Sequence, residues 1–219
     1  PLEALMPRGK SNPEEANALS MKLIPESSNF LFWVVIDPRK KGTFDQAESM
    51  LKLPHCAGIK IHPEEHEYHI LEYGDIIFEF AASHNAVIIS HSGEENSKPE
   101  DFVAFADKYP NVRLIISHLG CGYDGDIRHQ VRAIKNCRNC NMYTDTSSSQ
   151  SIMPNLIEWA VDEIGADRIL FGTDSPLYFA AMQRARIDYA DISVEDKKKI
   201  LYGNALKLFD NKRLEDLLK

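Results

Sequence analysis

The sequence of 219 residues has no long apolar run and no excess of basic charge, and each absence excludes a broad class of protein. A segment that crosses a bilayer needs about 18 consecutive apolar residues. No run approaches that length, so no membrane partner is expected. Lysine and arginine total 25 against 33 aspartate and glutamate residues, a formal net charge of -8. A nucleic-acid partner is therefore not expected, because phosphate neutralisation needs a basic surface.

A small polar or anionic molecule still fits as the substrate, since one local site can oppose the global charge. Cysteine is scarce as well. The four cysteines, Cys56, Cys121, Cys137 and Cys140, do not make a disulfide framework in a chain of this length. We therefore expect reduced thiols and a cytoplasmic location. No signal peptide is visible, although the chain opens on Pro1 instead of an initiator methionine.

Glycine-rich nucleotide loops are also absent, whereas a repeated unit is present in which a short apolar run precedes a helix-like stretch. The runs are rich in β-branched and aromatic residues, which is typical of strands buried on both faces. Consecutive ends of these runs lie 25 to 29 residues apart, which fits one strand and one helix per unit. The runs cover residues 30–37, 58–62, 86–91, 112–118, 141–145 and 168–174.

The segments between and beside the runs carry helix signals. Residues 99–108 begin with proline and two acids and continue with apolar residues at helical spacing. Residues 154–164 start with a proline and stop at Gly165, and a further helix begins near Asn12. Ser193 is the expected N-cap of a helix near the C-terminus. Six such alternations predict an α/β fold with parallel strands.

Two architectures compete, an open doubly wound sheet and a closed barrel. Polar residues end nearly every run, and in (β/α) barrels the chemistry gathers from several strands at the carboxyl-terminal rim. A doubly wound sheet concentrates function at one switch point, often with a glycine-rich loop. The sequence therefore favours a (β/α)8 TIM barrel.

The number of strands falls short of that architecture, because a barrel of this type has eight and only six runs are present. We predict one (β/α)-barrel domain over residues 1–219, N-terminally incomplete and lacking the first one or two strands. An open barrel side exposes edge backbone groups and core side chains. We therefore expect the chain to form a homo-oligomer through this side, or to aggregate.

His91, His118 and Asp174 each end a predicted strand, so all three side chains should face one rim. Neutral imidazole and carboxylate are ligands that Zn²⁺ and similar divalent ions prefer. A bound ion lowers the pKa of a water molecule, and a nearby histidine or aspartate accepts its proton. Three matched strand ends predict a metal-dependent active site.

Three further polar residues are candidate substrate-binding groups. Lys60 and His62 lie two positions apart on one predicted strand and so share a face. Lys60 either contacts substrate or pairs with a buried carboxylate, and His62 is either a substrate contact or a hydrogen-bonded structural residue. Asp145 ends another strand, where it contacts substrate or caps the following helix.

The segments around these residues resemble the amidohydrolase superfamily. Residues 89–93, 116–120 and 168–176 are similar to its fifth-, sixth- and eighth-strand signatures, and Gly-Thr-Asp-Ser-Pro at 172–176 is the most specific part. Residues 58–63 resemble its fourth-strand motif, and residues 193–205 its closing helix. The nearest branch is amidohydrolase 2, the metal-dependent hydrolases of the TIM-barrel fold, which also includes decarboxylases.

The resemblance implies a role for each of these residues. His91 is then a metal ligand, His118 binds or orients the activated water or the substrate, and Asp174 contacts the metal and takes the proton. The implied cofactor is a divalent metal, usually Zn²⁺. The implied activity is hydrolysis of a small polar substrate, with non-oxidative decarboxylation on the same metal site as the alternative.

One departure from the family pattern stands against activity. The family's first strand ends in His-x-His, which supplies two metal ligands, and this sequence contains no His-x-His. A catalytic zinc normally has three protein ligands, whereas His91 and Asp174 provide two. A non-catalytic barrel remnant is therefore the alternative from a different class of function.

Overall fold

The computed structural model describes residues 12–23 and 30–209. Its six strands form one parallel sheet in the order β1-β2-β3-β4-β5-β6, so the predicted strands and their direction are confirmed. Five of them lie inside the predicted runs, and β2 begins two residues earlier than predicted. The strands are β1 (Phe32–Val35), β2 (Cys56–Ile61), β3 (Val87–Ser90), β4 (Arg113–Ile116), β5 (Met142–Asp145) and β6 (Ile169–Leu170).

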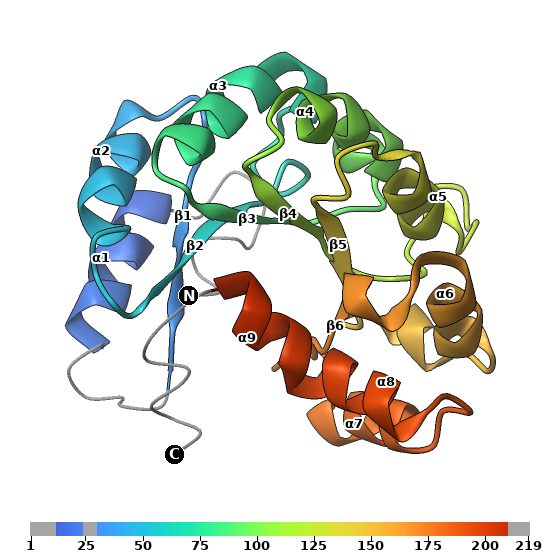
Figure 1. Ribbon diagram of the computed structural model, residues 1–219. Helices are drawn as coiled ribbons and strands as arrows, with labels where there is room; N and C mark the ends of the chain where they lie inside the picture. Colours follow the sequence, from blue (N-terminus) through green and yellow to red (C-terminus); the bar gives the residue numbers. More distant parts are fainter. Residues whose placement is uncertain (1–11, 24–29, 210–219) are drawn as a thin grey trace.

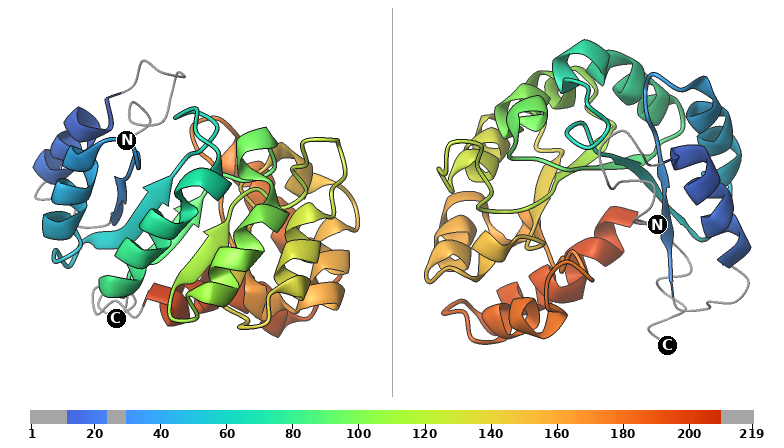
Figure 2. Two further views of the ribbon diagram at one scale, coloured as in Figure 1. Left: turned by 90° about the horizontal axis from the view of Figure 1, so that it is seen from above. Right: turned by 180° about the vertical axis from the view of Figure 1, so that it is seen from behind.

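Helices follow the strands in turn and cover the convex side of the curved sheet (Figure 1). The views from above and from behind show the same arrangement, with the last helix crossing the concave side (Figure 2). This is the layering of a (β/α) barrel with six strands present. The helices are α1 (Pro13–Leu23), α2 (Lys41–Met50), α3 (Ile70–Ser83), α4 (Val103–Lys108), α5 (His129–Asn136), α6 (Leu156–Ile164), α7 (Ala180–Asp188), α8 (Val194–Lys198) and α9 (Asn204–Phe209).

The helix ends agree in part with the signals in the sequence. Ser193 caps α8, where its hydroxyl accepts a hydrogen bond from the Asp196 amide at 3.0 Å. Helix α6 ends at Gly165, whose φ of 78° lies in the left-handed region that favours glycine. Its start differs from the prediction, because Asn155 is the N-cap and the helix begins two residues after Pro154. The stretch 99–108 is a 3-10 turn over Pro99–Phe102 that continues into α4.

Alternating side chains of the strands face two different cores. Ile59, Ile88 and Leu114 are fully buried between the sheet and its helices. The neighbouring positions face the concave side, where Lys60 lies beside Ile89 in the register of β2 and β3. One strand thus supplies an apolar contact to the helices and a polar group to the barrel interior.

The barrel is open between β1 and β6, which are the edges of the sheet and do not pair with each other in the described part of the chain. Helix α9 covers some of the concave face. Its Leu208 packs against the inner cluster that contains Ile115, and the Phe209 ring meets Trp33 edge to face at 5.5 Å between centroids. Within residues 12–23 and 30–209, no helix has the length and apolar character that crossing a membrane requires.

Candidate active site at the carboxyl ends of the strands

A cavity of about 210 Å³ opens where the strands end, and five of the six predicted site residues line it. It is small beside the 300–1,000 Å³ of sites for drug-sized ligands. The five residues come from β2 or from the segments that follow β2, β3, β4 and β6, so the expected rim is present. They are Lys60, His62, His91, His118 and Asp174.

Three imidazole rings form a continuous cluster in this cavity. The His62 and His91 rings stack with centroids 4.1 Å apart at 11°, and the His118 ring lies 4.7 Å from that of His91. Burial lowers the pKa of all three histidines, and the pKa of His118 falls to about 4. Lys60 lowers these values further. The cluster is therefore neutral at physiological pH.

His118 is held in one orientation by Ser147 and Asp145. The His118 Nδ1 lies 3.0 Å from the Ser147 carbonyl oxygen, which only accepts hydrogen bonds, so Nδ1 carries the proton. The Ser147 hydroxyl donates to the Asp145 carboxylate, which also accepts from the His118 backbone amide at 3.1 Å. The second ring nitrogen, Nε2, keeps a free lone pair in the neutral form.

Asp145 is buried and is not one of the residues that line the cavity. Burial alone raises its pKa. The nearby His118 and the hydrogen bonds from Ser147 and from the His118 amide outweigh burial, and the net pKa is lowered. Ser148, and not Asp145, caps the turn that follows, while Asp145 accepts a hydrogen bond from the Ser147 amide at 3.0 Å; the substrate contact predicted for Asp145 stays a prediction. Asp145 positions His118.

Lys60 brings an amino group to the inner end of the cavity. Burial lowers its pKa, and the charges of Asp145 and Asp174, which act in the opposite direction, do not outweigh burial. The lysine forms no ion pair with either acid in the described part of the chain. Lys60 therefore faces the cavity without a paired carboxylate, which fits the prediction of a substrate contact better than that of a buried pair.

Backbone geometry brings the end of β6 close to that of β5. Asp174 has a φ of 50° and His118 a φ of 76°, both in the left-handed region that is uncommon for residues other than glycine. A Cβ atom at Gly172 would lie 2.9 Å from the Ser147 Cβ. Glycine at this position lets the Gly-Thr-Asp-Ser-Pro segment approach Asp145.

The donors in the cavity meet the needs of a divalent ion only in part. His91 is neutral and half-buried, as a metal ligand must be, but its Nε2 lies 2.6 Å from a carboxylate oxygen of Glu94. Among the described residues, no three imidazole, thiolate or carboxylate groups come together closely enough to hold a metal. His91 and Asp174 are thus two candidate ligands of an incomplete set, because a catalytic zinc site has three protein ligands.

The structure adds residues that the sequence did not single out. Glu94 reaches the cavity from the segment after β3, and Tyr178 and Leu177 reach it from the segment after Asp174. Cys121 also lines it, and burial raises the pKa of its thiol, so it is not an activated nucleophile. Glu94 lies three residues after His91, a spacing with no distinctive pattern in the sequence.

His62 lines the cavity and also has a structural bond. Its Nδ1 accepts a hydrogen bond from the Glu65 amide at 3.2 Å, so the neutral ring carries its proton on Nε2. Both functions predicted for this residue are therefore compatible with one geometry.

The sequence family described as amidohydrolase matches residues 12–210 of the chain. A curated relative, the gamma-resorcylate decarboxylase of Polaromonas sp. strain JS666, is 36% identical over an alignment 118 residues long, which covers 47% of this chain and 36% of that protein. The chain thus spans about a third of that relative's length.

Solved structures share the fold at lower sequence identity. The 2,6-dihydroxybenzoate decarboxylase from Rhizobium has a TM-score of 0.72 at 17% identity, covering 96% of this chain and 81% of its own. A dihydroxybenzoic acid decarboxylase from Polaromonas sp. JS666 with bound manganese has a TM-score of 0.70 at 20% identity, covering 94% and 77%. These likenesses support the incomplete TIM barrel.

Proposed function

Because the chain belongs to the amidohydrolase family, we propose that the protein is a metal-dependent enzyme that decarboxylates a small aromatic carboxylate. The curated relative and the two solved structures described above are named as decarboxylases, which supports the decarboxylase alternative over the hydrolysis expected from the sequence. The manganese in one matched structure supports a divalent metal and gives no specific support to zinc.

The observation that carries this proposal is the placement of Lys60 among three neutral imidazoles and Asp174 in one small cavity. A carboxylate substrate needs a cation for recognition. A neutral, desolvated surrounding then favours loss of that charge as carbon dioxide leaves. Hydrolysis of an amide has no comparable need for a buried cation.

The matched enzymes also indicate a substrate class. Gamma-resorcylate is another name for 2,6-dihydroxybenzoate, a benzoate with a hydroxyl group on each side of its carboxylate, so both matched enzymes are named for the same compound. We assign Lys60 to the carboxylate of such a molecule, and the unprotonated Nε2 of His118 to the neighbouring hydroxyl as a hydrogen-bond acceptor.

The overall step replaces carbon dioxide with a proton. The ring carbon that bears the carboxylate forms a new bond to hydrogen, the carbon–carbon bond breaks, and its electron pair returns to the ring. Asp174 faces the cavity; in its protonated form it delivers the proton to this carbon, and the resulting carboxylate takes a proton from water before the next turnover. His118 and Lys60 hold the ring so that this carbon lies next to Asp174.

His91 and Asp174 would hold part of a metal's coordination sphere. When bound, a divalent ion acts as a Lewis acid on substrate oxygens.

A non-catalytic barrel remnant is the second candidate. It is favoured by one observation, the absence of a three-donor metal group among residues 12–23 and 30–209. Activity separates the two candidates.

The test is an assay of the longest natural chain that contains this sequence, purified without chelator. We expect carbon dioxide from 2,6-dihydroxybenzoate with added Mn²⁺, loss of activity with chelator, and no turnover of benzamide or of a lactone. Turnover of the amide or lactone alone contradicts decarboxylation. No turnover of any compound, together with no bound divalent ion, favours the remnant.

A further inference from the structure

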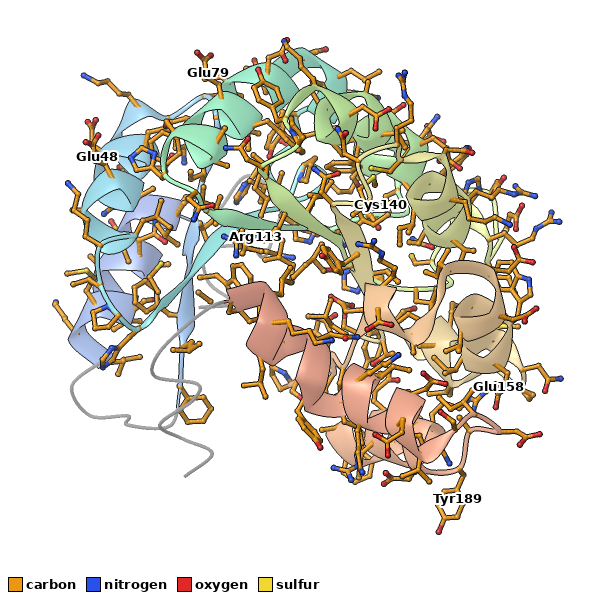
Figure 3. All side chains as sticks on the ribbon, viewed as in Figure 1. Glu48, Glu79, Arg113, Cys140, Glu158 and Tyr189 are labelled. Atoms are coloured by element: carbon orange, nitrogen blue, oxygen red, sulfur yellow. The ribbon has the colours of Figure 1, made fainter. Side chains whose placement is uncertain are left out.

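A second cavity, of about 240 Å³, lies at the opposite ends of the strands. Arg113 begins β4, Arg168 directly precedes β6, and Tyr143 lies on β5 between them. Figure 3 shows Arg113 on the concave side of the sheet, toward α9. Arg113 begins β4, whereas His118 follows the carboxyl end of that strand at Ile116. This cavity is therefore separate from the candidate active site.

The two arginines of this cavity differ from the other arginines that the structure describes. The others each form an ion pair with a carboxylate, and they are Arg39, Arg128, Arg132, Arg138, Arg184 and Arg186. Arg113 and Arg168 instead bond to neutral oxygens. Among the arginines that the structure describes, the two whose guanidinium groups form no ion pair with a carboxylate thus line the same cavity.

Backbone carbonyls fix both guanidinium groups without neutralising them. Arg113 donates to the Leu208 carbonyl at 2.6 Å and to the Asn85 carbonyl at 2.8 Å. Arg168 donates to the Cys140 carbonyl, and its guanidinium lies 5.2 Å from the Tyr143 ring centroid. A guanidinium has five N–H donors, so each arginine keeps donors for another partner.

The acid in the cavity does not balance these charges. Asp167 lies 2.8 Å from Lys199 and 3.6 Å from Lys207, which also lines the cavity. Two lysines therefore share this carboxylate. The cavity retains net positive charge in a chain whose formal net charge is -8. Because both arginines are half-buried, a partner of opposite charge lowers the cost of holding them there.

We propose that this cavity binds a small oxyanion, a carboxylate or phosphate group, between Arg113 and Arg168. Guanidinium forks match the paired oxygens of both groups. Such an oxyanion belongs either to a free small molecule or to a carboxylate side chain of this protein. The sequence continues after Phe209 with the acids Asp210, Glu215 and Asp216.

The test titrates the full chain with inorganic phosphate and follows both calorimetric binding and the midpoint of thermal unfolding, with sodium chloride of matched ionic strength as the reference. We expect phosphate to bind and to raise the midpoint. Arg168→Gln should weaken phosphate binding about tenfold or more, because a charge-assisted bidentate contact is lost. Arg138→Gln is the matched control, since Arg138 is an exposed arginine paired with Asp107, and it should bind as the unchanged chain does.

A further variant, with Asp210→Asn, Glu215→Gln and Asp216→Asn, distinguishes the two sources. Unchanged phosphate binding in this variant indicates a free ligand, and binding gained or tightened in it indicates the chain's own acids. Arg168→Lys keeps the charge and loses the fork, and it replaces Arg168→Gln if that variant fails to fold. The proposal is overturned if phosphate binds equally with and without Arg168. It is also overturned if phosphate does no more than chloride in both the unchanged chain and the acid-free variant.

Discussion

Two histidine environments lie in the segments that follow β3 and β4, and they have opposite charge states. The His91 and His118 rings are desolvated beside Lys60, and their pKa values are lowered. His129, at the start of α5, contacts a carboxylate through each ring nitrogen, Glu100 at Nδ1 and Asp124 at Nε2. Burial alone lowers the pKa of His129, but these two acids outweigh it and the net pKa is raised.

The difference separates a chemical role from a structural one. A neutral imidazole has a lone pair for a metal, a proton or a substrate hydroxyl. The His129 imidazolium has none, and it joins Glu100, in the segment after β3, to Asp124, in the segment after β4. We infer that His129 keeps these two segments together, and that the cluster does the chemistry.

The largest expected effect comes from Asp145→Asn. This change removes the negative charge that orients His118 through Ser147 and opposes the charge of Lys60. We expect decarboxylation to fall by on the order of 10² to 10⁴, as when the acid that orients a catalytic histidine is lost. Steady-state kinetics measures it. The control is Asp126→Asn, an acid paired with Arg128 at the surface, and equal losses in both variants would contradict the role of Asp145.

Lys60→Met tests whether Lys60 binds the substrate carboxylate. It removes the cation assigned to the carboxylate and one source of the low histidine pKa values. We expect KM to rise roughly tenfold to a hundredfold, since a hydrogen bond to a charged group contributes about 1.5–3 kcal/mol. Lys135→Met is the control, because Lys135 pairs with Glu163 away from the cavity. An unchanged KM would remove Lys60 from recognition.

The smallest effect is expected from His129→Asn, on stability. Because the pKa of His129 is raised, this residue contributes its full stabilisation of the fold below the pKa of the unfolded chain, about 6.5. That stabilisation is lost as the pH rises through the pKa of His129 in the folded protein. The pKa of Asp124 is lowered, first by the Asp126 amide and then by His129, so its contribution is lost as pH falls well below about 3.9.

Urea unfolding from pH 3 to pH 9 measures this dependence. We expect His129→Asn to lower the free energy of unfolding by about 1 kcal/mol in the pH band between about 3.9 and about 6.5, and by less outside that band. Glu79→Gln, which changes an exposed residue of α3 on the outside of the molecule in Figure 3, should show no such band. A loss of unfolding free energy that is constant from pH 3 to pH 9 would contradict the assignment of His129 as an imidazolium in contact with two carboxylates.

The sequence was sufficient to predict the strands and the rim. Buried parallel strands are nearly continuous apolar runs, so their ends are visible, and Lys60, His91, His118 and Asp174 all line the cavity. Asp145 was recognised as a strand end, but its actual contacts depend on Ser147, which lies in an ordinary polar stretch.

Other features depend on contacts between distant segments and leave no local pattern. The sequence gives no indication that Glu94 lies on His91, or that His129 lies between Glu100 and Asp124. The pairing of Arg113 with the Leu208 carbonyl joins residues 95 apart, and no periodicity reports such a contact. The homo-oligomer expected from the open barrel side stays a prediction.

The most direct test is an NMR titration of the histidine rings in protein that has been treated with a chelator to remove metal. The variants His118→Gln and His129→Asn assign the histidine signals. We expect His118 to titrate near pH 4 and His129 to titrate above 6.5, the ordinary value. If His118 titrates at or above 6.5, or His129 titrates below 6.5, then the cavity histidines are not neutral or His129 is not charged, and the assignment of their roles is contradicted.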